Sequence, residues 1–480
     1  MTLKFGHIEN RLFLIGSAFF LLLMLLAMYW QLSLLLLLPI PITLIFIFLK
    51  DVRFAFYALM FSLPLSFQFL EKYDFPDEPL MILNSGFFLF FCLFNYRKIK
   101  LKALLLNPLF IAVMLSVIWL IVTVILSKNS LLSAKFLLKK IWYIIPFFLW
   151  PIIFFQEKKV VIRSYQLLFS SLFVIVIVVL IRFSAVGFAF DRVHDPIQPF
   201  FQNHVMYGSM VSVMLPFVVA AFSLSRKLSV QWLISLVAIM LFLAGVYYSY
   251  SRAAWVAVLF AGATYFAIRM KIMHWVILLF YAVVFALVFW LAKQNTYLSY
   301  KPKFEKTIMH ESIEDHIIAT IQGTDISSAE RYYRWIAALR MSTENPVFGV
   351  GPNNFYDFYK PYTITSFRTW VSRNPERSTT HNYFLFMLVE QGIPALLLYA
   401  ILIFVLFFYG QKVLYRQNNR FSKAVVMSSL CCIAAIFINN FFSELLETDK
   451  IGSLFYLSIA AILALDYRSK QHLTEEAATL

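Results

Sequence analysis

The sequence predicts an all-α integral membrane protein with about fourteen transmembrane helices and one large extracytoplasmic loop. Of its 480 residues, 61% are apolar and only 14% are charged, against roughly one quarter in soluble domains. Apolar runs of about 20 residues, the length that crosses a hydrocarbon layer of about 30 Å, recur along the chain. The 41 Lys and Arg residues exceed the 25 Asp and Glu residues, but they lie in short clusters between these runs, which argues against nucleic acid as a partner.

The apolar runs define the expected helices in order. The first run has no small-residue cleavage site and is followed at once by a second, so we expect a retained helix and not a signal peptide. The expected helices are 12–30, 32–49, 54–70, 80–95, 104–126, 141–155, 161–181, 207–223, 231–249, 254–268, 274–292, 383–409, 424–442 and 451–466.

The loop charges predict the orientation. Lys and Arg gather on one alternating set of connections, which places these connections and both termini in the cytoplasm. The opposite set holds the acidic segments 71–78 and 444–449 and the long loops 183–206 and 293–381, which are therefore predicted to be extracytoplasmic. Four parts follow from this pattern: an N-terminal bundle (1–200), a second set of helices (201–292), the large loop (293–381) and C-terminal helices (382–480).

One connection departs from the charge rule. Residues 127–140 should be extracytoplasmic, yet they contain Lys128, Lys135, Lys139 and Lys140. The first three would share one face of a short interfacial helix that could attract lipid phosphate groups. Snorkelling lysines at the end of a membrane helix, or a misplaced helix boundary, explain the pattern equally well.

The large loop contains the most informative residues. Its segment 329–359 begins with residues that suit a helix, which carries Arg331 and Trp335 and ends before Glu344-Asn345-Pro346. A tight turn is expected at 349–352, where a Gly-x-Gly without a preceding strand does not predict a dinucleotide site.

His381 follows the hydroxyl residues 378–380, which favour a helix N-cap, so we expect it in the first helical turn. The positive end of a helix disfavours imidazolium and would keep His381 neutral, as a general base requires. Gly392-Ile393-Pro394 should interrupt the same helix, and Glu390 lies in the apolar stretch, where an ionisable group is costly. A histidine at the membrane interface can also be a simple polar belt residue.

Arginines supply a second candidate feature. Arg252 opens the 254–268 helix on the outer side and, with Arg331 and Arg334, could present guanidinium groups to a diphosphate. Arg192 and His204 are further candidates of the same kind, with a solvated-loop role as the alternative.

Three motifs in this order resemble the O-antigen ligase and polymerase superfamily. The resemblance covers roughly residues 200–410 and departs from the family pattern at Ala253, where Gly is common, and at Pro394. The motifs are Ser251-Arg252-Ala253-Ala254-Trp255, then Arg331 with Trp335, Pro346 and Phe348-Gly349-Val350-Gly351, and finally His381-Asn382-x-x-Leu385-x-x-Leu388-Val389-Glu390-x-Gly392-Ile393.

The resemblance implies a GT-C-like membrane glycosyltransferase of lipopolysaccharide or other polysaccharide biosynthesis. Such an enzyme transfers a glycan from undecaprenyl diphosphate to a hydroxyl acceptor, with inversion, at the periplasmic face of the bacterial inner membrane. By similarity His381, Arg331 and Arg252 are the catalytic residues. Substrate-binding roles are expected for Arg334, Asn382, Glu390, Arg192 and His204.

The resemblance does not fix the identity of the acceptor. A ligase would use the sugar core of lipid A, a polymerase a second carrier-linked repeat, and an O-oligosaccharyltransferase a protein hydroxyl. A lipid-linked glycan transporter would also be polytopic, but it should show a repeated helix pattern in its two halves, and none is seen.

No cofactor and no metal are expected. The outer carboxylates nearest to a metal-binding pair are Glu447 with Asp449, and Asp74 with Asp77 and Glu78, and both groups lie outside the motifs. Guanidinium groups can replace the electrostatic role of a cation, so we expect a metal-independent site. The three cysteines, Cys92, Cys431 and Cys432, lie in apolar runs and predict neither a disulfide framework nor zinc.

Overall fold

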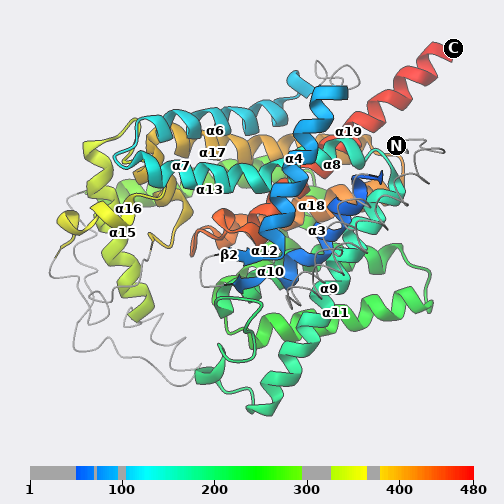
Figure 1. Cartoon of the computed structure of the whole chain (residues 1–480), viewed down its shortest axis with the longest axis horizontal. Coiled ribbons are helices and arrows are strands. Elements are labelled where there is room, and N and C mark those ends of the chain that lie inside the picture. The colour runs from blue at the N-terminus through cyan, green and yellow to red at the C-terminus, as the bar shows by residue number, and fades with distance from the viewer. Residues whose placement is uncertain (1–49, 70–72, 96–103, 294–325, 365–378, 480) are drawn as a thin grey trace, which may run out of the picture.

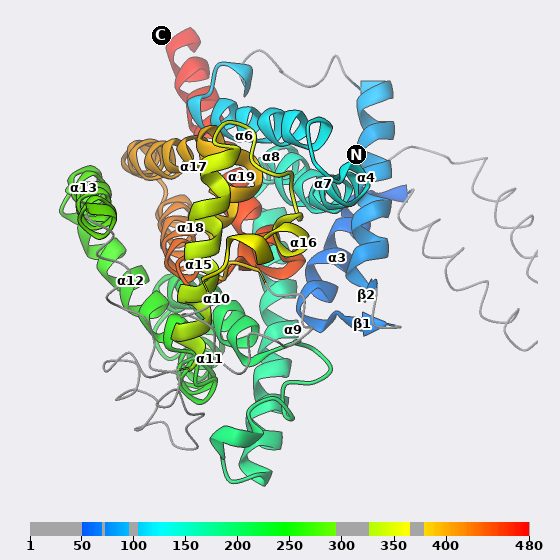
Figure 2. The same cartoon turned by 90° about the vertical axis from the view of Figure 1, so that its left-hand side faces the viewer.

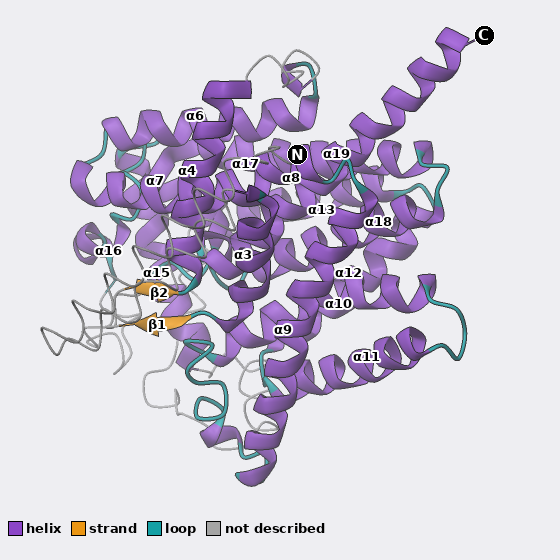
Figure 3. Ribbon diagram, turned by 45° about the vertical axis from the view of Figure 1, so that its right-hand side comes forward, coloured by secondary structure: helices purple, strands orange, loops and turns teal. Residues whose placement is uncertain are grey.

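The computed structural model describes residues 50–69, 73–95, 104–293, 326–364 and 379–479 (Figure 1). The expected helices 12–30 and 32–49 lie outside the described residues. The predicted fold class is confirmed, because the described chain is helical apart from one short antiparallel hairpin, in which β1 (Phe67–Phe69) pairs with β2 (Tyr73–Phe75) (Figure 3).

Ten described helices are long and apolar enough to cross a membrane. Two of the expected membrane helices are described but are not among these ten. The 54–70 span is the shorter helix α3, which ends at Leu65 where the hairpin begins, and the 254–268 span is α12 (Arg252–Arg269). The ten are α4 (Asp77–Asn95), α6 (Pro108–Ile125), α7 (Ser130–Ile144) with its continuation to Phe154, α9 (Lys158–Ala185), α10 (His204–Leu224), α11 (Val230–Tyr248), α13 (Met273–Ala292), α17 (Tyr383–Arg416), α18 (Arg420–Asn439) and α19 (Asp449–Thr479).

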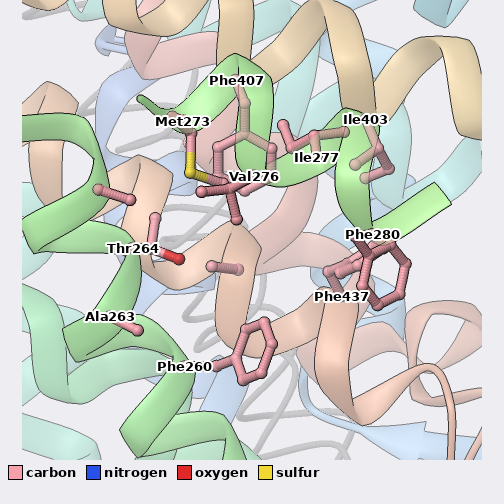
Figure 4. Close-up of a pocket in the computed structure, with 12 residues that line it drawn as sticks. Phe260, Ala263, Thr264, Met273, Val276, Ile277, Phe280, Ile403, Phe407 and Phe437 are labelled. Atoms are coloured by element: carbon pink, nitrogen blue, oxygen red, sulfur yellow. The ribbon is translucent and has the colours of Figure 1, made fainter. Parts of the chain in front are cut away.

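The centre of the bundle is formed by α18 and α19. Their apolar windows are 78% and 94% buried inside the protein, whereas that of α13 is only 6% buried. An apolar cavity of about 230 Å³ separates α13 from α12, α17 and α18 (Figure 4). Its lining includes Phe260, Ile277 and Phe407, and Thr264 is the one hydroxyl side chain among its wall residues, so this cavity suits a hydrocarbon chain and not a polar group.

One end of the bundle carries α15 (Ile326–Glu344) and the four-residue helix α16 (Phe355–Phe358). Here α6, α7 and α17 lie side by side, and α15 crosses their ends (Figure 1; end-on in Figure 2). We call this end of the bundle the loop end. The helix predicted before Glu344-Asn345-Pro346 is confirmed, and α15 extends one residue further than expected, to Glu344.

The 127–140 segment is not a separate interfacial helix. Asn129 caps α7 by accepting from the Leu132 amide, and the helix then continues through a π turn (Ile145–Leu149) and α8 (Trp150–Phe154) as one apolar helix. The expected boundary at 141 was therefore wrong. Lys140 is buried against Glu447, and Lys139 is 3.4 Å from an Asp449 carboxylate oxygen. These partners lie about 300 residues away in the chain, beyond the reach of local periodicity.

The predicted break in α17 is confirmed at Gly392, which has φ 80° and ψ −179°. Pro394 has no amide hydrogen, so the Glu390 carbonyl has no helical donor and accepts instead from the Gly351 amide at 2.9 Å. The freed Ile393 amide donates to the Pro346 carbonyl at 2.8 Å, and the Val350 amide donates to the Val389 carbonyl. The turn at 349–352 is thus hydrogen-bonded into the break.

We predict that Gly392→Ala lowers the free energy of unfolding by about 2 kcal/mol or more, because only glycine adopts this backbone region readily. An added Cβ would also lie 2.0 Å from the Val347 carbonyl oxygen. Gly262→Ala is the matched control, since no heavy atom lies within 4 Å of its added Cβ and alanine is favoured in a helix by up to about 1 kcal/mol. Unfolding in detergent measures both, and equal stability of the two variants would contradict the prediction.

Candidate functional site

His381 lies in a tight turn immediately before α17 and not in its first helical turn as expected. The N-cap is Asn382, whose side chain accepts from the Leu385 amide at 3.0 Å. His381 itself has φ 51°, a left-handed conformation that only a minority of residues adopt. We call residues 379–383 the His381 turn.

The His381 turn is held by the loop that follows α18. Glu444 accepts from the Thr379 and Thr380 hydroxyls, both at 2.6 Å, and from the Asn382 amide at 3.1 Å. The Tyr383 amide donates to the Asn440 carbonyl at 2.8 Å. Hydrogen bonds to a carboxylate are stronger than neutral ones, so Glu444 fixes the backbone on both sides of His381.

Helix α15 covers the same turn. The Trp335 indole donates to the Thr380 carbonyl at 2.9 Å, and Ala337 and Met341 pack in a small core with Val350 and Val389. This packing places Arg331 and Arg334 beside His381, because both guanidinium charges act on its imidazole.

Burial lowers the pKa of His381 below its ordinary value of 6.5, and the positive charges of Arg334 and Arg331 lower the pKa further. The carboxylates of Glu444 and Glu330 act in the opposite direction. The imidazole is therefore neutral near physiological pH, as expected. The causes that the sequence did not reveal are burial and the two arginines, which lower this pKa.

Arg252 begins α12, as predicted, and Ser251 is the N-cap of that helix. Helix α12 packs against α10 and α18, and the loop after α18 carries Glu444. Helix α18 therefore contacts the helix that begins at Arg252 and leads into the loop that holds the His381 turn. The charged groups that shift the His381 pKa are Glu444 and residues of α15.

The Glu390 side chain has a structural role. Its side chain is 1% exposed and accepts from the Asn353 and Phe355 amides, which caps α16 and holds the 349–355 segment against α17. The sequence did not reveal this role, because spacing does not show that distant backbone amides bind a buried carboxylate. A substrate contact by Glu390 stays a prediction. Asn382 is likewise engaged as the N-cap.

Arg192 lies in the loop between α9 and α10, and His204 lies at the start of α10. The Arg192 side chain is 62% exposed and forms ion pairs with Asp191 and Asp195, as a solvated-loop residue would. His204 is the first residue of α10, and its ring lies 5.0 Å from that of His194.

Glu444 is the site residue that the motifs did not reveal. It lies 62 residues after Asn382, and the only sequence signal was the acidic character of 444–449. Across the ranges that the structure describes, no three His, Cys, Asp or Glu side chains form a group that could hold a metal ion.

The fold and this site define a multi-pass α-helical membrane protein with a polar site built by a loop at the helix ends. The family model described as O-antigen ligase matches residues 236–400, so this region of the chain is similar to that family. The match confirms the resemblance seen in the motifs and supports a membrane enzyme of the glycan ligase or polymerase type. It includes Arg252, Arg331, Arg334 and His381, whereas Glu444 lies beyond it. A comparison with curated proteins found no match.

We predict that Glu444→Gln loosens the His381 turn, because the amide replaces a carboxylate that accepts three hydrogen bonds. The expected loss is about 1–3 kcal/mol of local stability. Hydrogen exchange of the Asn382 and Tyr383 amides measures it. Glu157→Gln is the control, since Glu157 is an exposed partner of Arg53 at the other end of the bundle. Equal exchange at the turn in both variants would contradict the assigned role.

Proposed function

We propose that this protein is an inner-membrane glycosyltransferase that moves a glycan from undecaprenyl diphosphate to a hydroxyl acceptor at the periplasmic face. The observation that carries the proposal is the neutral His381 held beside Arg331 and Arg334 within the family-matched region. A neutral imidazole next to two guanidinium groups suits a reaction that removes a proton and releases a diphosphate.

The proposed step is a direct displacement at the anomeric carbon of the donor sugar. The acceptor oxygen forms the new bond to this carbon while the bond from the carbon to the diphosphate oxygen breaks on the opposite side, which inverts the configuration. The acceptor proton passes to His381, and the bonding electron pair leaves with the diphosphate. Because one displacement inverts the centre, one base is sufficient.

The two arginines of α15 would stabilise the leaving group. Arg334 is held by Glu330 at 3.4 Å, and both side chains are largely buried, so its guanidinium is positioned before substrate binds. Arg331 lies one helical turn earlier on the same face. Arg252 would contribute a third guanidinium from the start of α12. Forked donors in a poorly hydrated site match diphosphate oxygens.

We favour a ligase whose acceptor is the sugar core of lipid A, as the family description suggests. A polysaccharide polymerase or an O-oligosaccharyltransferase would use the same step with another hydroxyl. A transporter of lipid-linked glycan would need no base, so formation of a new glycosidic bond by the purified protein separates it from all three enzymes.

We predict that His381→Ala lowers turnover by roughly two to four orders of magnitude with little change in donor binding. Arg331→Lys should not restore activity, because lysine keeps the charge but lacks the forked donors. Arg340→Lys is the control, since Arg340 is exposed on the same helix. The assay uses purified protein in nanodiscs with lipid-linked donor and acceptor glycan.

Substantial turnover by His381→Ala would remove this histidine from the chemical step. Loss of activity in EDTA that Mg²⁺ restores would replace the arginine mechanism with a metal-dependent one.

We predict that Arg334→Gln moves the acid limb of the kcat/KM profile to higher pH. The Arg334 charge lowers the His381 pKa, so its removal raises this pKa and protonates the base at a higher pH. The profile of the residual activity is compared with that of Arg340→Gln, which should keep the wild-type position of the limb. A shift toward lower pH, or no shift, would exclude His381 as the titrating base.

A further inference from the structure

A polar cavity lies at the loop end of the bundle, and its wall residues are outside the family-matched region. Its volume is about 360 Å³, within the roughly 300–1,000 Å³ of small-molecule sites. We call it the carboxylate cavity. Segments distant in sequence build its wall, which includes Asp74, Asp77, Lys139, Gln202, Asp449 and Lys450.

The two lysines of the cavity are already engaged. Lys450 donates to the Pro64 and Ser66 carbonyls at 3.1 and 2.9 Å and to the Phe200 carbonyl. Lys139 lies between two carboxylates, 3.4 Å from Asp449 and 3.6 Å from Asp74. Neither lysine is therefore well placed to bind an added anion.

Two buried carboxylates keep unused hydrogen-bonding capacity. Asp77 is 0% exposed and its Oδ2 has no hydrogen-bond partner. Asp449 is 5% exposed; its Oδ2 lies 3.4 Å from the Lys139 ammonium nitrogen, and its buried Oδ1 has no hydrogen-bond partner in the described structure. A buried acceptor without a donor costs about 1–3 kcal/mol, so a ligand that brings hydroxyl donors would be stabilised here.

The charge of the cavity selects against phosphate. Its wall holds three acidic side chains, Asp74, Asp77 and Asp449, against two lysines that are already engaged, Lys139 and Lys450. Glu447 also lines the cavity, but it is paired with Lys140. Phe67 and Phe200 add aromatic surface to the same wall. Hydroxyl donors combined with an apolar face are the properties of a sugar ring.

The same short segment reaches both the cavity and the His381 turn. Glu444 holds the turn, Glu447 accepts from the Tyr383 hydroxyl at 2.8 Å, and Asp449 and Lys450 line the cavity. The cationic helix α15 lies elsewhere on this end of the protein, away from the β1–β2 hairpin that borders the cavity (Figure 2). The arrangement separates a cationic side for diphosphate from an anionic side for hydroxyl groups.

We propose that the carboxylate cavity binds a neutral sugar ring of the acceptor glycan. This inference rests on the proposed function, because it names the acceptor's binding place in that reaction. Asp77 and Asp449 accept from the sugar hydroxyls, and the segment 444–450 connects the bound acceptor to the turn that carries His381.

Saturation-transfer NMR on the full-length protein in nanodiscs tests the inference, with methyl glucoside, N-acetylglucosamine and glucuronate as probes. We expect the neutral sugars to bind and the glucuronate anion to bind more weakly. Asp77→Asn should weaken binding roughly tenfold, about 1.4 kcal/mol. Gln202→Trp fills the cavity from an exposed position, so it tests the site without altering the core.

Asp466→Asn is the matched control, because Asp466 is a buried aspartate farther along α19 that pairs with Lys470 and is not in the cavity wall. It should bind sugars as the wild type does. No saturation of any neutral sugar by the wild type, or equal binding by Gln202→Trp, would overturn the proposal.

A parallel turnover assay separates the two proposals. Sugar binding that is lost in Asp77→Asn and Gln202→Trp, without glycan transfer by the wild type, would keep the cavity and reject the proposed function. Glycan transfer that requires His381, with sugar binding unchanged in both variants, would keep the proposed function and reject the cavity as a sugar site.

Discussion

The contact between Glu444 and the His381 turn is the constraint on which the site depends. A histidine at φ 51° before a membrane helix has no regular hydrogen-bonding pattern of its own to hold it. Glu444 supplies that order by accepting from Thr379, Thr380 and the Asn382 amide. Because Glu444 lies between α18 and α19, whose apolar windows are 78% and 94% buried, the turn is positioned by the centre of the bundle.

The break in α17 anchors the loop that carries the arginines of the site. Gly392 and Pro394 release backbone groups that the 346–351 segment then satisfies, and Glu390 adds two hydrogen bonds to the 353–355 backbone. Unsatisfied backbone groups are costly at membrane depth, so the break is stable only with the loop in place. The loop in turn carries α15 with its arginines to the His381 turn.

The parts predicted from sequence are those set by local patterns. Hydropathy located the helices, and short motifs located His381, Arg331 and the break at Gly392. The errors concern residues whose partners are remote in the chain. Lys128, Lys135 and Lys139 suggested a lipid-binding surface because Asp74 and Asp449 could not be seen as partners of Lys139. The hydrogen bonds of Glu390 to the 353–355 backbone were not foreseen for the same reason, and Glu444 was missed.

The most direct test of the account is a structure of the protein with a polyprenyl diphosphate bound in a nanodisc. The account predicts that the diphosphate oxygens lie within hydrogen-bonding distance of Arg331 and Arg334, with the His381 imidazole beside them and the carboxylate cavity free of phosphate. A diphosphate bound at Lys139 and Lys450, remote from His381, would contradict the account.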